Sequence, residues 1–170
     1  MTKHLTLKHI FDTDEETFWP KVFFNADYNR RLYAEALKYK RWELLDQHEE
    51  PGGVIVRRAV MEPNFDVPSL LKKAIGDGVA YTEEGRYDPK SKRWRYTITP
   101  NRMAERLTTR GEYWVESRGE KKIERICTVD LEAKIFGIGG ALESFIEKQT
   151  REAYDVTTRF TNQFIRDNGL

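Results

Sequence analysis

The chain has 170 residues, of which 39% are hydrophobic and 34% are charged, and its 29 basic and 28 acidic side chains leave a net charge of +1. This near balance argues against a nucleic-acid partner held by bulk charge. The single cysteine, Cys127, excludes an internal disulfide, and no run approaches the ~20 apolar residues of a membrane span. Because the first residues lack a signal-peptide pattern, we expect a single cytoplasmic domain over residues 1–170.

The N-terminal part of the chain predicts one strand and two short helices. Residues 3–11 alternate between apolar and polar, which indicates a half-buried strand with His9 on its apolar face. Thr13 and Glu16 have the spacing of a capping box, so the first helix is expected to begin there. A second helix is expected over roughly 26–37.

The middle of the chain, from Tyr39 to Leu131, has a period of two. Six strands are expected to form three hairpins, because each pair flanks a turn that contains Pro or Gly. The expected strands are 40–49, 54–62, 79–88, 92–99, 105–117 and 121–133. A short amphipathic helix is expected to begin at Pro68, between the second and third of these strands.

The C-terminal part of the chain has a helical period. Its apolar stripe comprises Leu142, Ile146, Gln149, Ala153, Val156, Phe160 and Phe164. A helix of about 28 residues would be roughly 42 Å long. Such a helix needs a surface against which to bury its stripe, and the only large apolar surface expected is one face of the antiparallel sheet.

Two motifs carry a resemblance to a known superfamily. They are Phe18-Trp19…Phe23-Phe24…Tyr28, which enters the short helices, and KIFGIGGALE at 134–143, which joins the last strand to the long helix through glycines followed by a Glu. Together with the element order, they resemble the START-like helix-grip superfamily (SRPBCC-type), which includes lipid-transfer, polyketide-cyclase and plant-hormone-receptor proteins. Within it the chain looks most similar to an uncharacterised bacterial branch, and the VASt sterol-transfer domain is a more distant relative.

The resemblance implies an α+β fold of the order β-α-α-β6-α. A curved antiparallel sheet of about seven strands would wrap around the long C-terminal helix, with a cavity for a hydrophobic small molecule between them. The glycines at 137–140 do not match a phosphate-binding loop, because they lack the following Lys-Ser/Thr and a parallel-sheet context. They are expected to let the last strand leave the sheet so that the helix can cross its concave face.

Three polar side chains fall in phase with apolar neighbours on expected strands. Arg58 alternates with valines, Arg125 alternates with Ile123 and Cys127, and His9 shares the apolar face of its strand. Facing inward, the arginines would suit a carboxylate, phosphate or carbonyl on an otherwise apolar ligand, whereas a bulge or phase slip would send them to solvent. The residues expected to line the cavity are His9, Arg58, Trp94, Tyr96, Tyr113, Arg125, Val129, Leu142, Phe145, Ile146, Gln149 and Val156.

The segment 64–78 is a candidate lid over the cavity. Its amphipathic patch consists of Phe65, Leu70, Leu71 and Ile75. The Leu-Leu pair next to two lysines could touch an anionic membrane transiently during loading. The alternative is that the segment packs permanently on the body of the protein.

The expected function is to bind, carry or sense a hydrophobic or amphipathic, lipid-like small molecule. No cofactor is implied, and no metal-ligand spacing appears in the sequence. Two alternatives stay open. One is a cyclase or hydrolase of the same fold that uses His9, and the other is a protein-interaction module whose cavity is filled by its own side chains. The sequence leaves the ligand and the oligomeric state open.

Overall fold

The computed structural model describes residues 2–170, and its elements follow the expected order. The strands are β1 (Lys3–Phe11), β2 (Arg41–Glu50), β3 (Val54–Glu62), β4 (Tyr81–Asp88), β5 (Arg93–Pro100), β6 (Leu107–Ser117) and β7 (Ile123–Ala133). The α-helices are α1 (Glu15–Thr17), α2 (Ala26–Arg31), α3 (Ser69–Ile75) and α4 (Gly139–Asn168), and two π-helical segments are η1 (Phe18–Phe23) and η2 (Leu32–Ala36).

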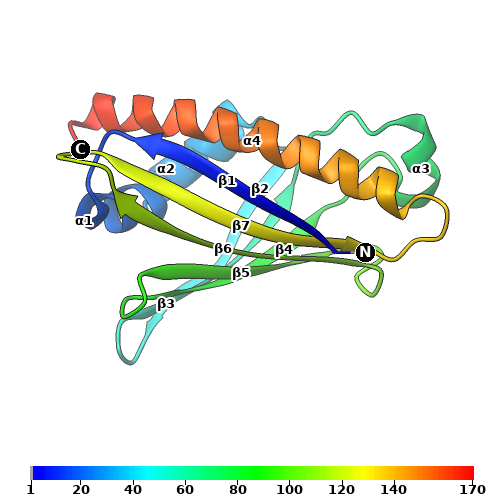
Figure 1. The fold of residues 1–170 in the computed structure, drawn as a ribbon, viewed down its shortest axis with the longest axis horizontal. Helices are drawn as coiled ribbons and strands as arrows, with labels where there is room; N and C mark the ends of the chain where they lie inside the picture. The colour runs from blue at the N-terminus through cyan, green and yellow to red at the C-terminus, as the bar shows by residue number, and fades with distance from the viewer. Residues whose placement is uncertain (1) are drawn as a thin grey trace.

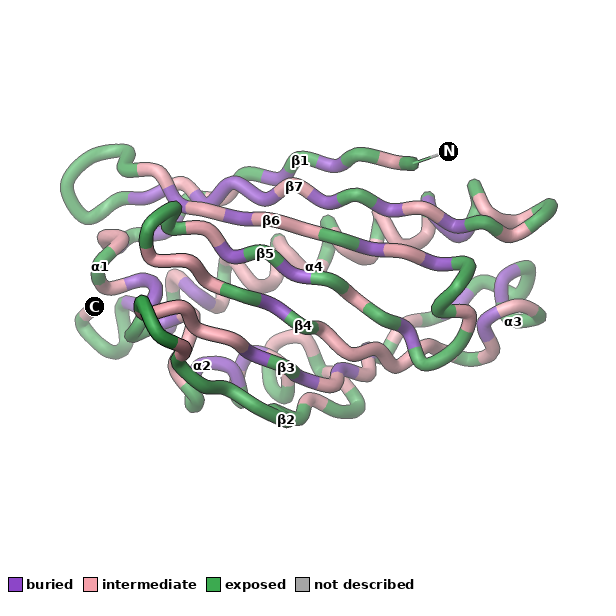
Figure 2. The backbone as a smooth tube through the Cα atoms, turned by 90° about the horizontal axis from the view of Figure 1, so that it is seen from below, coloured by how far each residue is buried: buried purple, intermediate pink, exposed green. Residues whose placement is uncertain are grey.

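The seven strands form one antiparallel sheet in the order β1-β7-β6-β5-β4-β3-β2. Figure 1 shows α4 running along the concave side of the sheet, and Figure 2 shows the strands in this order with α4 behind them. The helix contacts β1, β7 and η2. The predicted α+β helix-grip fold is therefore confirmed.

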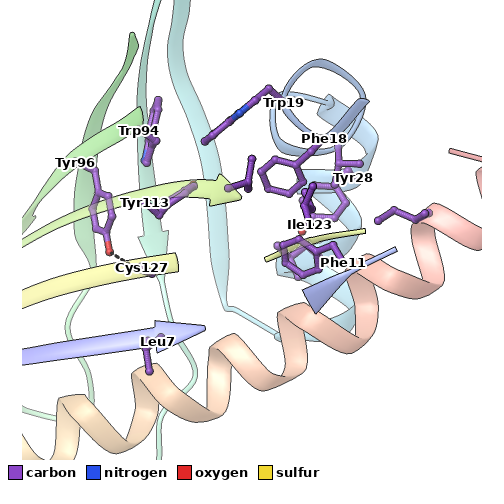
Figure 3. Packing of buried hydrophobic residues seen from close by; sticks show 14 of the residues in the cluster. Leu7, Phe11, Phe18, Trp19, Tyr28, Trp94, Tyr96, Tyr113, Ile123 and Cys127 are labelled. Atoms are coloured by element: carbon purple, nitrogen blue, oxygen red, sulfur yellow. Dashed lines mark hydrogen bonds between the residues drawn. The ribbon is translucent and has the colours of Figure 1, made fainter. Parts of the chain in front are cut away.

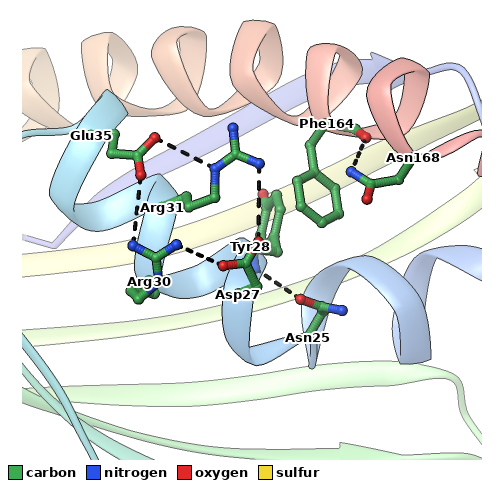
Figure 4. Close-up of polar contacts among 8 residues, drawn as sticks. All are labelled: Asn25, Asp27, Tyr28, Arg30, Arg31, Glu35, Phe164 and Asn168. Carbon is green, nitrogen blue, oxygen red and sulfur yellow. Dashed lines mark hydrogen bonds and ion pairs between the residues drawn. The ribbon is translucent and has the colours of Figure 1, made fainter.

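The short helices at one end of the sheet are fixed by polar caps and by contacts with α4. Asp14, rather than the predicted Thr13, caps α1, since its carboxylate accepts a hydrogen bond from Thr17 N at 2.8 Å. The hydroxyl of Tyr28 in α2 lies 2.7 Å from Thr161 Oγ1 in α4. Figure 4 shows Tyr28 and Arg31 beside the Phe164 ring, which lies 5.2 Å from the Tyr28 ring. These contacts hold α2 against the C-terminal half of α4.

Two glycines on the inner face let aromatic rings lie flat on the sheet. Gly85 and Gly111 flank Tyr96 on the neighbouring strands. A Cβ on Gly85 would lie 1.9 Å from the Trp94 ring, and a Cβ on Gly111 would lie 2.1 Å from the Tyr96 ring. Any side chain at these two positions would therefore displace a ring from the inner face.

The junction between β7 and α4 explains the glycine motif and the Glu that follows it. A Cβ on Gly139 would lie 2.5 Å from the carbonyl oxygen of Ala133, so only glycine allows the helix to begin this close to the end of the strand. The buried carboxylate of Glu143 accepts a hydrogen bond from Ala133 N at 2.9 Å. Gly137 has a φ of +80°, which gives the chain its turn out of the sheet. Two features therefore explain the expected role of these glycines in turning the chain. Gly139 approaches the backbone of Ala133 closely, and Gly137 has a positive φ.

The buried apolar residues form two clusters. The larger cluster lies toward η1 and α2 and is rich in aromatic rings, among them Phe18, Trp19 and Trp94 (Figure 3). The smaller cluster lies around α3 and the start of α4, and includes Ile75 and Leu142. Between them runs the inner face of the sheet.

Candidate functional site: an internal cavity with buried charges

A cavity of about 230 Å³ lies between the inner face of the sheet and α4. Residues from η1, α2 and η2 line one end, and residues around α3 line the other. These two groups of elements lie at opposite ends of the sheet (Figures 1 and 2). The expected residues that line the cavity are Tyr96, Tyr113, Arg125, Val129, Leu142, Phe145, Ile146 and Gln149.

The predicted inward orientation of Arg58 is wrong, and its neighbour Arg57 takes that place. Arg58 lies on the convex face and pairs with exposed Glu84 at 3.0 Å, and 55% of its side chain is accessible. Arg57 is buried, with 4% of its side chain accessible, and it lines the cavity. The valines that suggested the opposite phase lie on the convex face, because β3 carries apolar residues on both faces.

Three other expected lining residues lie away from the cavity. Trp94 is fully buried. The rings of Phe23 and Phe24 cover it, with ring centres 5.1 and 5.8 Å from the Trp94 ring centre. Val156 is half-buried on the flank of α4, where Ala153 and the residues near it face the cavity instead. His9 points inward from β1 but lies behind Arg125, outside the lining.

A buried ion pair crosses the wall of the cavity between β3 and β4. Arg57 Nη2 lies 3.5 Å from Glu83 Oε1, and Arg57 Nη1 donates to the carbonyl oxygen of Phe23 at 3.3 Å. The guanidinium carbon also lies 4.4 Å from the centre of the Phe23 ring. Burial raises the pKa of the Glu83 carboxyl, and Arg57 opposes that rise. The charge of Arg57 thus has a carboxylate partner in Glu83, which was not predicted from the sequence.

Arg125 is the second buried arginine, and its surroundings differ from those of Arg57. It is 7% exposed. Its guanidinium carbon lies 4.9 Å from the centre of the Phe11 ring, 6.0 Å from that of Tyr113 and 4.6 Å from that of Tyr154. Its Nη2 lies 3.4 Å from His9 Nδ1. Among residues 2–170 its buried Nε has no hydrogen-bond partner, and no carboxylate lies within 4 Å of it. Glu112 on β6 and Asp130 on β7 bind Arg93 and His4 on the convex face.

His9 serves as a neutral neighbour of this guanidinium. Burial lowers the pKa of His9 to about 4, and the charge of Arg125 acts in the same direction. The neutral ring accepts from Arg125 at Nδ1, which places the ring proton on Nε2, facing Asp155 Oδ1 at 3.7 Å. His9 therefore orients Arg125 without neutralising its charge.

A small polar cluster lies beside Arg125 on the inner face. The Cys127 thiol lies 3.2 Å from the Tyr154 hydroxyl. It also lies 3.9 Å from the Tyr96 hydroxyl (Figure 3). Burial raises the pKa of Cys127 and of both tyrosines, so all three groups stay protonated and can act as hydrogen-bond donors. Tyr154 was not predicted, although it continues a small and polar helical stripe through Thr150, Ala153 and Thr157.

The candidate lid lies over the α3 end of the cavity. Phe65 and Ile75 line the cavity, and the Phe65 ring contacts the Phe145 ring edge-on at 6.0 Å. Leu71 is buried in the smaller cluster and Leu70 is 63% exposed, so neither lines the cavity. Only Leu70 of the Leu-Leu pair is therefore placed to touch a membrane, because Leu71 is buried.

Within residues 2–170, no group of three or more His, Cys, Asp or Glu side chains is arranged to hold a metal ion. No helix in this part of the chain is both long and apolar enough to cross a membrane.

Several solved structures share this fold over nearly the whole chain. The ZhuI aromatase/cyclase from a Streptomyces species is 13% identical with a TM-score of 0.67, covering 100% of this chain and 97% of that one. A START superfamily protein from Mycobacterium smegmatis is 10% identical with a TM-score of 0.61, covering 95% and 98%. Norcoclaurine synthase from Thalictrum flavum, in complex with dopamine and hydroxybenzaldehyde, is 13% identical with a TM-score of 0.61, covering 96% and 88%. The resemblance to the START-like superfamily is confirmed for the fold.

Fewer proteins are related to the chain by sequence than by fold. No curated protein shows a significant match to the chain. Residues 6–165, which include all seven strands in whole or in part and most of α4, match one family model. The chain therefore belongs to the family described as protein of unknown function (DUF2505).

Proposed function

We propose that this protein binds and carries, or senses, a small hydrophobic or amphipathic molecule in the cavity between the sheet and α4. The observation that carries the proposal is the cavity of about 230 Å³, which residues from both ends of the molecule enclose. A module filled by its own side chains would leave no such space. Two aromatic compounds in the complex of norcoclaurine synthase, which shares the fold, also support a small-molecule ligand.

The size of the cavity favours a compact ligand. Pockets for drug-sized molecules span about 300–1,000 Å³, and this cavity is slightly smaller. One or two fused rings or a single medium-length acyl chain would fit, whereas a two-chain lipid would require the cavity to open. The catalytic alternative built on His9 is not supported, because His9 lies behind Arg125 rather than in the lining.

A cavity-filling substitution tests the proposal. Ala153 faces the cavity from α4, whereas Ala141 on the same helix is exposed. We expect Ala153→Leu to reduce ligand affinity about tenfold or more without unfolding the protein, because the added methyl groups occupy ligand space. Ala141→Leu is the matched control and should bind as the wild type does.

The ligand for comparing Ala153→Leu with Ala141→Leu is identified by native mass spectrometry and organic extraction of protein purified from its own source. Titration of both variants and the wild type with the extracted compound then gives the affinities. An apo mass together with failure to bind any member of a panel of small aromatic and acyl compounds would contradict the proposed function.

A further inference from the structure

We propose that the ligand carries a carboxylate or comparable oxyanion, which Arg125 binds, while its apolar body extends toward α3. This inference rests on the proposed function and deepens it by naming the chemical class of the ligand and its direction in the cavity. The argument depends on the difference between the two buried arginines that line the cavity, Arg57 and Arg125.

Arg57 already has a protein anion, and Arg125 does not. The guanidinium of Arg57 faces the Glu83 carboxylate at 3.5 Å and also donates to a backbone carbonyl. Arg125 faces three aromatic rings and a neutral His9, and no carboxylate of residues 2–170 lies within 4 Å of its guanidinium. The Nε atoms of both arginines lack a hydrogen-bond partner in this part of the chain, so the carboxylate partner is what distinguishes Arg57 from Arg125. Burying a charge without a counter-ion is costly, and ring faces offset only part of that cost. The Arg125 charge is therefore the one that an anionic ligand would compensate.

The groups around Arg125 suit an oxyanion. The hydroxyls of Tyr96 and Tyr154, which line the cavity, are protonated donors. Asp155 lies beside the ring nitrogen of His9 that faces away from Arg125, and 66% of its side chain is accessible, so it does not occupy the cavity side of the guanidinium. A carboxylate here would receive a charge-assisted hydrogen bond from Arg125, which is stronger than a bond between neutral groups.

The opposite end of the cavity is apolar, which gives the ligand a direction. Val67, Ile75, Leu107, Leu142, Phe145 and Ile146 line it, and all belong to or pack against the smaller apolar cluster. Arg125 lies near the start of β7, whereas Leu142 and Ile146 lie in the first turns of α4, next to the end of β7. An amphipathic acid thus finds its counter-ion at one end and an apolar wall at the other.

Matched ligand pairs test this inference. The probes are 2-naphthoate and its neutral counterpart 2-naphthamide, together with octanoate and octanamide, titrated at neutral pH by calorimetry. We expect wild-type protein to bind each acid at least about tenfold more tightly than its amide, since a hydrogen bond to a charged group contributes more than one between neutral groups. In Arg125→Met, the acid-to-amide ratio should fall to about one while amide binding persists.

The matched control is Arg58→Met, because Arg58 lies on the same sheet but on its convex face. It should retain the wild-type ratio. Ile146→Trp fills the α3 end and should weaken octanoate more than 2-naphthoate without inverting the preference for acids. If Arg125→Met does not fold, Arg125→Gln takes its place, because glutamine also removes the positive charge, and the same fall in the acid-to-amide ratio is expected.

The outcomes separate this inference from the proposed function. Equal affinity of wild-type protein for acid and amide, with both lost in Ala153→Leu, would overturn the role of Arg125 and keep the cavity as a binding site. An unchanged acid preference in Arg125→Met would likewise overturn it. Failure of every probe, and of the extracted compound, to bind would overturn both.

Discussion

His9 and Arg125 illustrate how one buried pair sets the charge of the cavity wall. They are direct partners in the register of β1 and β7, and only the arginine carries charge at neutral pH. Burial is the main reason why the histidine is held neutral, and repulsion from the Arg125 charge acts in the same direction. The pair thus presents a fixed positive group to the cavity over the ordinary range of pH.

The lowered pKa of His9 predicts a loss of stability in acid. The unfolded chain takes up a proton on His9 near its ordinary pKa of 6.5, whereas the folded protein does so only near pH 4. Because the unfolded state binds the proton first, the free energy of unfolding should fall as the pH is lowered from 6.5 to about 4, by at most about 3 kcal/mol from this group.

Urea unfolding at several pH values between these limits measures the effect. His9→Gln should show a flatter dependence than the wild type. His48→Gln, which changes a half-exposed histidine on β2, is the matched control. Equal slopes in His9→Gln and the wild type would show that His9 is not held neutral by the fold.

At the scale of elements, the β7–α4 junction depends on two neighbouring glycines with different surroundings. A Cβ on Gly139 would meet a backbone oxygen at 2.5 Å, whereas a Cβ on Gly140 would meet no atom within 4 Å. Backbone cannot move aside as a flexible side chain does. We therefore expect Gly139→Ala to destabilise the protein by about 1–3 kcal/mol, in the range of overpacked sites.

Gly140→Ala provides the comparison one residue further along the helix. It should be neutral or stabilising by up to about 1 kcal/mol, because alanine has the higher helix propensity. Thermal unfolding of the two variants measures the difference. Similar melting temperatures for both would contradict the close approach at Gly139.

The elements were more predictable than the direction in which their side chains point. Turn residues and periodicity identified all seven strands and α4, because each depends on a pattern that spans many residues. The sequence VIVRRAVME of β3 is apolar on both faces, so a period of two cannot decide which arginine is buried. The deciding contacts, Glu83 on β4 and Phe23 on η1, come from elsewhere in the chain.

The helical stripe of α4 was predicted in outline, but the residues that face the cavity were identified only in part. Leu142, Ile146 and Gln149 line it, whereas Val156 lies on the flank. Farther along the helix, the side facing the cavity carries small and polar residues such as Ala153 and Thr157. An apolar periodicity does not indicate such positions, although small side chains leave space for a ligand.

For the molecule as a whole, the two ends of the cavity face different surroundings. Figure 1 shows α3 and the loop between β7 and α4 at the same end of the molecule. Leu70 is exposed on α3, and Phe136 is exposed in that loop. Lys72 and Lys73 follow Leu70 on α3, so apolar and basic side chains occur together there. We propose that this combination lets the α3 end touch an anionic membrane transiently, as expected for the candidate lid.

Replacing Leu70 tests this contact. We expect Leu70→Glu to slow ligand transfer out of vesicles containing anionic lipid severalfold, because it replaces an apolar contact with a like charge. Affinity for ligand added in free solution should stay unchanged, since Leu70 does not line the cavity. Leu44→Glu, at an exposed position on edge strand β2, is the control. Equal transfer rates for both variants and the wild type would contradict membrane contact at α3.

The glycines beneath Trp94 and Tyr96 have a consequence for protein engineering. Because the rings rest directly on the sheet at Gly85 and Gly111, the sheet side of the cavity tolerates little redesign. The opposite wall is a single helix whose facing positions, among them Gln149, Ala153 and Thr157, hold modest side chains. A library that varies only those helix positions would change the shape of the cavity while its sheet side stays constant, and would give related cavities from which small-molecule sensors could be selected.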